Sequence, residues 1–256
     1  MRSWRTCTFP ATVSSAPDLT SRILRQERAL LALAIALLVG MSWAFVVTGA
    51  GMPAGMDMAP TRPPFAALVV MWWVMMAAMM LPSASPALLL YARVRTARSG
   101  DPAVAATWLF LSGYLAMWLL FSLIAASAQT LLGDGAMAIG KPYLQAALLI
   151  AAGAYQLSPF KAACLGECRS PAQFISRHWR PGAVGAIRLG LLHGAYCVGC
   201  CWMLMALLFV GGVMNLWWVV ALTILVALEK LLKGGAWLAR ATGLALIAAG
   251  LALLLA

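Results

Sequence analysis

The sequence predicts an all-α fold, a polytopic bundle of about seven transmembrane helices. Hydrophobic residues make up 64% of the 256 residues and charged residues only 10%, against about 25% charged residues in soluble domains. A helix needs about 20 mostly apolar residues to cross a bilayer. Seven stretches meet this requirement, over residues 29–49, 65–91, 103–128, 142–158, 186–210, 213–230 and 239–255.

The first stretch follows a polar segment, and the fifth and sixth come from one long apolar run. Residues 1–28 are basic and rich in Ser, Thr and Pro, which predicts a disordered cytoplasmic tail before a single transmembrane domain over 29–256. Residues 189–228 hold no formal charge and are too many for one span. Gly211, Gly212 and Asn215 favour a turn between two helices at this point.

Basic residues alternate along the connections between these stretches. The N-terminal tail and the second, fourth and sixth connections, together with the helix ends beside them, hold 16 of the 18 Lys and Arg residues, and the first and third connections hold the other two. The positive-inside rule then predicts a cytoplasmic N-terminus and a periplasmic C-terminus, in a multi-pass protein of the bacterial inner membrane. The bias also explains the net charge of +11 through contact with the lipid bilayer, so nucleic acid is not an expected partner.

The fifth stretch carries the residues with the clearest chemistry. His193, Cys197, Cys200 and Cys201 have the i, i+4, i+7, i+8 spacing of one helix face. At 1.5 Å per residue the two last thiols lie about 18–20 Å into the membrane, near its centre. Imidazole and thiolate are soft ligands that suit Cu(I) or Zn(II). Cysteine also packs well as a small apolar residue, so a purely structural role competes with metal binding.

Two further groups of sulfur ligands support a metal site. Met75 and Met79 share one face of the second stretch, and thioethers bind Cu(I). The fourth connection, at 159–185, holds Cys164 and Cys168, whose spacing places both thiols on one side of a helical turn. Thiols in the cytosol stay reduced, which favours a hand-off pair for metal over a stable disulfide.

Two predictions concern the cytoplasmic end of the bundle. Ser170-Pro171 marks a helix start, and Phe174 and Ile175 belong to an apolar patch that predicts a short amphipathic helix on the inner leaflet. Glu229-Lys230 ends the sixth stretch and is expected to extend toward the membrane surface and to pair with Arg188 or Lys233.

The motifs together resemble a bacterial family of predicted metal-binding integral membrane proteins, domain of unknown function 2182. The resemblance covers about residues 65–250. It rests on the Met/Trp run of the second stretch and on the following blocks: Tyr155-Gln156-Leu157-Ser158-Pro159-Phe160-Lys161, Cys164, Cys168-Arg169-Ser170-Pro171, His193-Gly194, Cys197, Gly199-Cys200-Cys201-Trp202, Gly212-Val213-Met214-Asn215-Leu216 and Glu229-Lys230. The resemblance implies a membrane location and a metal site, with no assigned reaction.

The sequence therefore predicts an integral membrane protein that binds a soft metal within its helix bundle. Copper(I) is the expected ion and zinc the alternative. The expected role is metal transport, or delivery to another membrane protein, with a cytosolic or periplasmic metal chaperone as partner. An intramembrane thiol/disulfide redox protein and a structural assembly partner remain as alternatives. Catalysis by carboxylates is not expected, because the chain has only seven acidic residues.

Overall fold

The computed structural model describes residues 19–49, 64–99, 103–131 and 139–255, with side chains from residue 29 onward. This part of the chain folds into ten helices and no strand. The helices are α1 (Leu19–Thr48), α2 (Phe65–Ser99), α3 (Val104–Leu131), α4 (Pro142–Leu157), α5 (Pro159–Arg169), α6 (Pro171–His178), α7 (Gly182–Ala206), α8 (Leu208–Gly211), α9 (Leu216–Leu231) and α10 (Gly235–Leu255). The predicted all-α helix bundle is confirmed.

Five described segments are long and apolar enough to cross a membrane, namely α1, α2, α3, α7 with α8, and α10. The pair α4 and α5, bent by 62° at their junction, would make a sixth. Each of the seven predicted stretches coincides with a helix. However, α9 has 16 residues and is about 24 Å long, which is short of the hydrocarbon thickness. By length, the structure supports five to six spans rather than seven.

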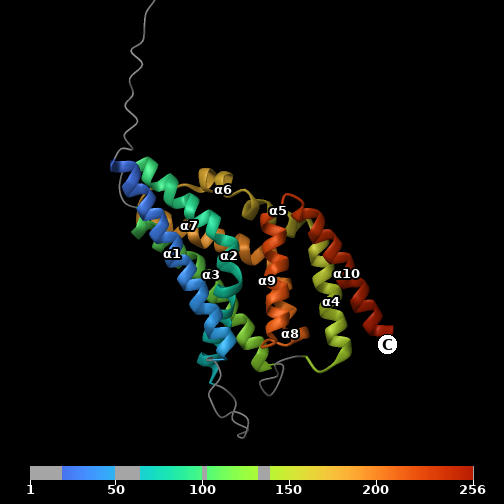
Figure 1. Cartoon of the computed structure of the whole chain (residues 1–256). Helices are drawn as coiled ribbons and strands as arrows, with labels where there is room; N and C mark the ends of the chain where they lie inside the picture. Colours follow the sequence, from blue (N-terminus) through green and yellow to red (C-terminus); the bar gives the residue numbers. More distant parts are fainter. Residues whose placement is uncertain (1–18, 50–63, 100–102, 132–138, 256) are drawn as a thin grey trace, which may run out of the picture.

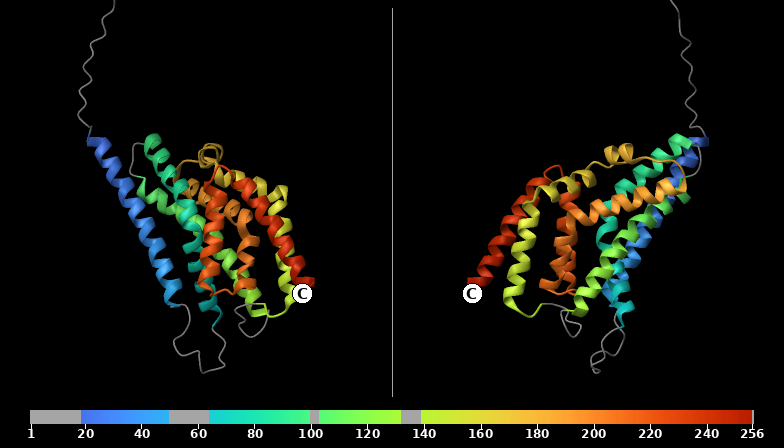
Figure 2. Two further views of the ribbon diagram at one scale, coloured as in Figure 1. Left: turned by 45° about the vertical axis from the view of Figure 1, so that its right-hand side comes forward. Right: turned by 180° about the vertical axis from the view of Figure 1, so that it is seen from behind.

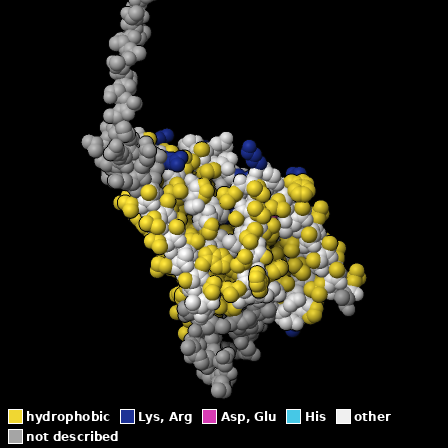
Figure 3. Space-filling model, in the orientation of Figure 1, with side chains coloured by type: hydrophobic (Ala, Val, Ile, Leu, Met, Phe, Trp, Pro, Cys, Tyr) yellow, Lys and Arg dark blue, Asp and Glu magenta, His cyan; other side chains and the backbone are white. Residues whose placement is uncertain are grey.

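The connections lie at two opposite ends of the bundle. The start of α1, the short helices α5 and α6, and the turn between α9 and α10 lie at the upper end in Figure 1, while α8 and the C-terminus lie at the lower end. Figure 3 shows that most visible Lys and Arg side chains gather at the upper end, with apolar side chains below them. This arrangement matches the alternation of basic connections in the sequence.

Helix α7 crosses the bundle obliquely between the group α1–α3 and the group α4, α9 and α10 (Figure 2). It packs closely along α3 because glycines remove side chains from the contact. A Cβ on Gly190 would meet Phe110 O at 2.0 Å, and one on Gly113 would meet Ile187 O at 2.4 Å. Small residues of this kind let membrane helices approach backbone to backbone. The α3–α7 contact thus sets the position of the cysteine-bearing helix.

Helix α6 begins at Pro171 as the sequence predicts, but its apolar face does not lie on lipid. Phe174 and Ile175 are buried in the core. The Phe174 ring lies 5.2 Å from the His193 ring and 5.9 Å from the Tyr196 ring, measured between centroids. The expectation of a lipid-facing helix was wrong because α7 offers an aromatic surface that covers the same apolar residues.

Candidate metal centre

Thiols from two helices meet beside the middle of α7. Cys197, Cys200 and Cys201 are buried on α7, and Cys168 on α5 is half-buried. The sulfur atoms of Cys168 and Cys200 lie 3.9 Å apart, and the Cys168 side chain also interacts with that of Cys197. All five cysteines in the described ranges are free thiols. The structure therefore adds a residue of the fourth connection to the thiols predicted on the fifth stretch.

The spacing of Cys168 and Cys200 suits two thiolates on one metal ion. Metal–sulfur bonds of about 2.3 Å in tetrahedral geometry place two sulfurs about 3.8 Å apart. The observed 3.9 Å needs almost no movement to reach this arrangement. The donor atoms are soft, which fits Cu(I) better than a hard cation.

A thioether completes the sulfur cluster, but it is not one of the two predicted. Cys201 Sγ lies 3.8 Å from Met80 Sδ. Met80 stands on the α2 row next to Met75 and Met79. Met75 instead lines a small cavity that includes Met71, and Met79 is buried in the core. The row that faces α7 depends on the rotation of α2 about its axis, which hydrophobic periodicity does not define when the helix is apolar on all sides.

Cys197 has two polar neighbours that the sequence did not suggest. Lys230 Nζ donates a hydrogen bond to Cys197 Sγ over 3.0 Å, and Tyr114 Oη lies 3.1 Å from the same sulfur. Lys230 is 6% exposed and Glu229 is 2% exposed, so the expectation that both extend to the membrane surface was wrong. An ammonium group at this distance stabilises a thiolate. Lys230 thus places a positive charge at the thiol cluster.

Two other predicted residues lie near the cluster without a sulfur contact. The His193 ring packs against Phe110 and Tyr114 of α3, with centroids 5.9 and 5.8 Å away, and its buried Nδ1 has no hydrogen-bond partner among the described residues. Cys164 packs on α7 at Gly199, where an added Cβ would meet its sulfur at 2.9 Å.

In the described ranges, no group of three or more His, Cys, Asp and Glu side chains has the arrangement of a metal site. Two sulfur pairs in the cluster have measured separations, 3.9 Å for Cys168 with Cys200 and 3.8 Å for Cys201 with Met80, and Cys197 interacts with Cys168. Thiolate and thioether sulfurs are soft donors that suit Cu(I), and thiolates also bind Zn(II).

Comparison with protein families agrees with this chemistry. The model of the PpoB2 family, described as copper chaperone, matches residues 69–253. The chain belongs to this copper chaperone family. The match runs from α2 to α10 and so includes every sulfur of the cluster. No curated protein and no solved structure matches the chain. The family match and the helices long enough to span a membrane together support a copper-related membrane protein, as the sequence predicted.

This member of the copper chaperone family also has a buried ionic network on the other side of α9. Lys161 Nζ lies 2.6 Å from Glu229 Oε2, with the two side chains 1% and 2% exposed. Gln156 Nε2 donates to Glu229 Oε1 over 2.8 Å, and Lys161 also donates to Gln156 Oε1. The adjacent residues Glu229 and Lys230 therefore connect α9 to the ionic network and to the thiol cluster.

Proposed function

We propose that this copper chaperone family member holds Cu(I) as cargo on the thiols of Cys168, Cys200 and Cys201 and on the thioether of Met80, and delivers it to another membrane protein. The observation that carries the proposal is the 3.9 Å contact between Cys168 and Cys200. It joins a thiol from the end of the bundle that holds α5 and α6 to a thiol on a membrane-spanning helix (Figure 1).

The remaining groups fit delivery by ligand exchange. The protein is a multi-pass protein of the bacterial inner membrane, with the α5–α6 end in the cytoplasm, in agreement with the positive-inside bias. Cys168 would accept Cu(I) there from a cytosolic chaperone. The ion would then move among neighbouring sulfurs, which lie within 4 Å of one another in each pair. Lys230 would balance the negative charge of a Cu(I) ion bound by two thiolates.

The test is a Cu(I) affinity measurement by chelator competition on detergent-purified protein under reducing conditions. Cys200→Ser removes a proposed ligand. Mutations of residues that only support a ligand lower metal affinity about 10–100-fold, so the loss of the ligand itself should weaken Cu(I) binding at least about ten-fold. Cys164→Ser is the matched control, because it removes a buried thiol one turn from Cys168 and should leave the affinity unchanged. Unchanged binding in a Cys168→Ser/Cys200→Ser variant would reject the proposed site.

Replacement of methionines tests whether Met80 is a ligand. Met80→Leu keeps the apolar volume and removes the sulfur, so Cu(I) affinity should fall and the copper absorption edge should report one sulfur fewer. Met76→Leu is the control on the same helix, since Met76 and Met80 are both fully buried. Equal affinities for the two variants would remove Met80 from the ligand set. Elemental analysis of the same samples distinguishes copper from zinc.

The Cys168–Cys200 contact also favours a second function, thiol/disulfide redox chemistry within the membrane. The two sulfurs would have to approach from 3.9 Å to about 2.05 Å to form a disulfide. This function predicts that mild oxidation removes two hydrogens from the protein mass, reversibly, and that the cross-link joins Cys168 to Cys200. Such a cross-link in a protein that does not bind Cu(I) would favour redox chemistry over copper delivery.

A further inference from the structure

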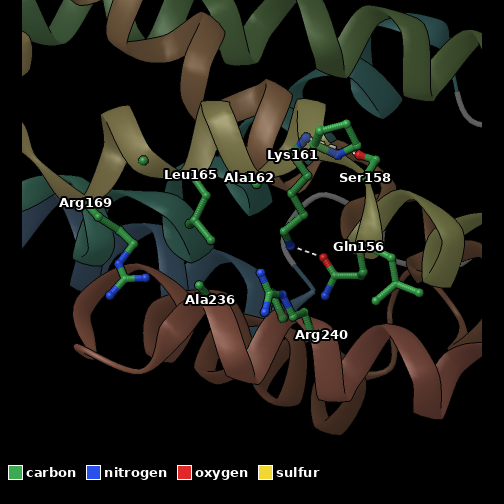
Figure 4. A pocket seen from close by; sticks show the side chains of 12 residues that line it. Gln156, Ser158, Lys161, Ala162, Leu165, Arg169, Ala236 and Arg240 are labelled. Atoms are coloured by element: carbon green, nitrogen blue, oxygen red, sulfur yellow. Dashed lines mark hydrogen bonds between the residues drawn. The ribbon is translucent and has the colours of Figure 1, made fainter.

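A cavity of about 490 Å³ lies between α5 and α10, on the face of α5 next to the one that bears Cys164 and Cys168. Figure 4 shows the side chains of Lys161, Arg169 and Arg240 directed into the space between the two helices. The cavity lies at the end of the bundle that carries the basic connections (Figure 1). Its volume falls within the range of small-molecule binding sites, about 300–1,000 Å³.

The cavity has an excess of positive charge. No Asp or Glu is among the residues that line it. Glu229, which does not line the cavity, neutralises the charge of Lys161 through their 2.6 Å ion pair. Arg169 uses Nη2 for the carbonyl oxygens of Leu232 and Lys233, at 2.7 and 2.6 Å, and keeps its charge and its other donors. Two arginine charges therefore remain in the cavity.

Arg240 has no hydrogen-bond or ion-pair partner in the part of the chain that the structure describes. The guanidinium group presents five N–H donors in a planar fork that matches the oxygens of a phosphate group. The polar residues Gln156 and Ser158 line the same cavity. The N–H donors of Arg240, which lines the cavity, are therefore available to a ligand.

Exposed apolar residues lie beside the cavity lining in the chain. Leu157 lines the cavity and is 42% exposed, and Phe160 and Trp237, each adjacent in sequence to a lining residue, are 64% and 73% exposed. Tryptophan at the end of a membrane helix is typical of the bilayer interface. Basic pockets between membrane helices on the cytoplasmic side bind anionic lipid headgroups. A bound phospholipid would require this arrangement, with apolar residues beside the cavity for its acyl chain and arginines within the cavity for its phosphate.

From these observations we infer that the α5–α10 cavity binds a phosphate-bearing anion, with Arg169 and Arg240 as its donors. The phosphate can come from the headgroup of an anionic phospholipid or from free phosphate in solution. The inference is independent of the copper proposal, because neither arginine touches a sulfur of the cluster. Occupation of the cavity would fix α5 against α10.

The experiment is native mass spectrometry of the full-length protein in a non-ionic detergent with added dioctanoyl phosphatidylglycerol. A single lipid should be retained, more tightly than dioctanoyl phosphatidylcholine of the same chain length. Arg240→Gln should weaken retention about five-fold, the factor that corresponds to about 1 kcal/mol for one cation at a membrane surface. Arg188→Gln is the matched control, since Arg188 is an exposed arginine near the same end of the bundle and does not line the cavity.

Competition with millimolar inorganic phosphate identifies the source of the anion. Displacement of the lipid, together with binding of phosphate alone that depends on Arg240, would assign the cavity to a soluble phosphate. Retention of the lipid would assign it to a headgroup. Equal retention of the two lipids, or equal retention by wild type, Arg240→Gln and an Arg169→Gln/Arg240→Gln variant with unchanged circular dichroism, would overturn the inference.

Discussion

Replacing Glu229 by glutamine removes the negative charge that neutralises Lys161 and keeps the size of the side chain. The two charged groups lie 2.6 Å apart and are almost fully buried. At an effective dielectric constant of 20 their attraction is about 6 kcal/mol, and desolvation offsets much of it. The variant leaves Lys161 as a buried, unpaired charge, for which measured costs are about 3–5 kcal/mol. We therefore expect the free energy of unfolding to fall by about 3–5 kcal/mol.

The assay is equilibrium unfolding in mixed detergent micelles, followed by tryptophan fluorescence. Glu167→Gln is the control, because the ion pair of Glu167 with Arg177 is 3.1 Å long and the Arg177 side chain is 62% exposed. An exposed pair of this kind contributes at most about 1 kcal/mol. Glu229→Gln combined with Lys161→Met removes both buried charges and should restore most of the lost stability. The reasoning is refuted if Glu229→Gln destabilises the protein no more than Glu167→Gln does.

Two other changes test the helix contact and the charge at the thiol cluster. Gly190→Ala places a Cβ at 2.0 Å from Phe110 O and should cost several kcal/mol of stability, because the atom that it meets belongs to the backbone. The control Gly40→Ala meets nothing within 4 Å and should be neutral or stabilise α1 by up to about 1 kcal/mol. Similar unfolding curves for both variants would contradict the close α3–α7 contact. Lys230→Met removes the positive charge that lies 3.0 Å from Cys197 Sγ in the thiol cluster and that would balance two copper-bound thiolates. It should lower Cu(I) affinity about ten-fold, as changes beside metal ligands do, and an unchanged affinity in chelator competition would show that the ammonium group does not stabilise the bound state.

Several features of the thiol cluster were predictable from the sequence because they depend on one helix at a time. The spacing of Cys197, Cys200 and Cys201 defines a common face of a single helix, and all three are buried as expected. The spacing of Cys164 and Cys168 likewise predicted a helical turn, which is α5. The ligand roles of Met75, Met79 and His193 stay predictions, because the thioether that contacts a thiol belongs to Met80.

The sequence by itself determined the all-α class, the positions of the apolar helices and the end of the bundle that carries the basic residues. These properties follow from composition, from the number of consecutive apolar residues and from the order of charges along the chain. Only the tertiary structure decided which residues of different helices meet. Cys168 reaches Cys200, Met80 reaches Cys201, and Lys161 reaches Glu229, 68 positions away. Such contacts depend on the rotation and crossing of packed helices, and close glycine contacts between backbones set both.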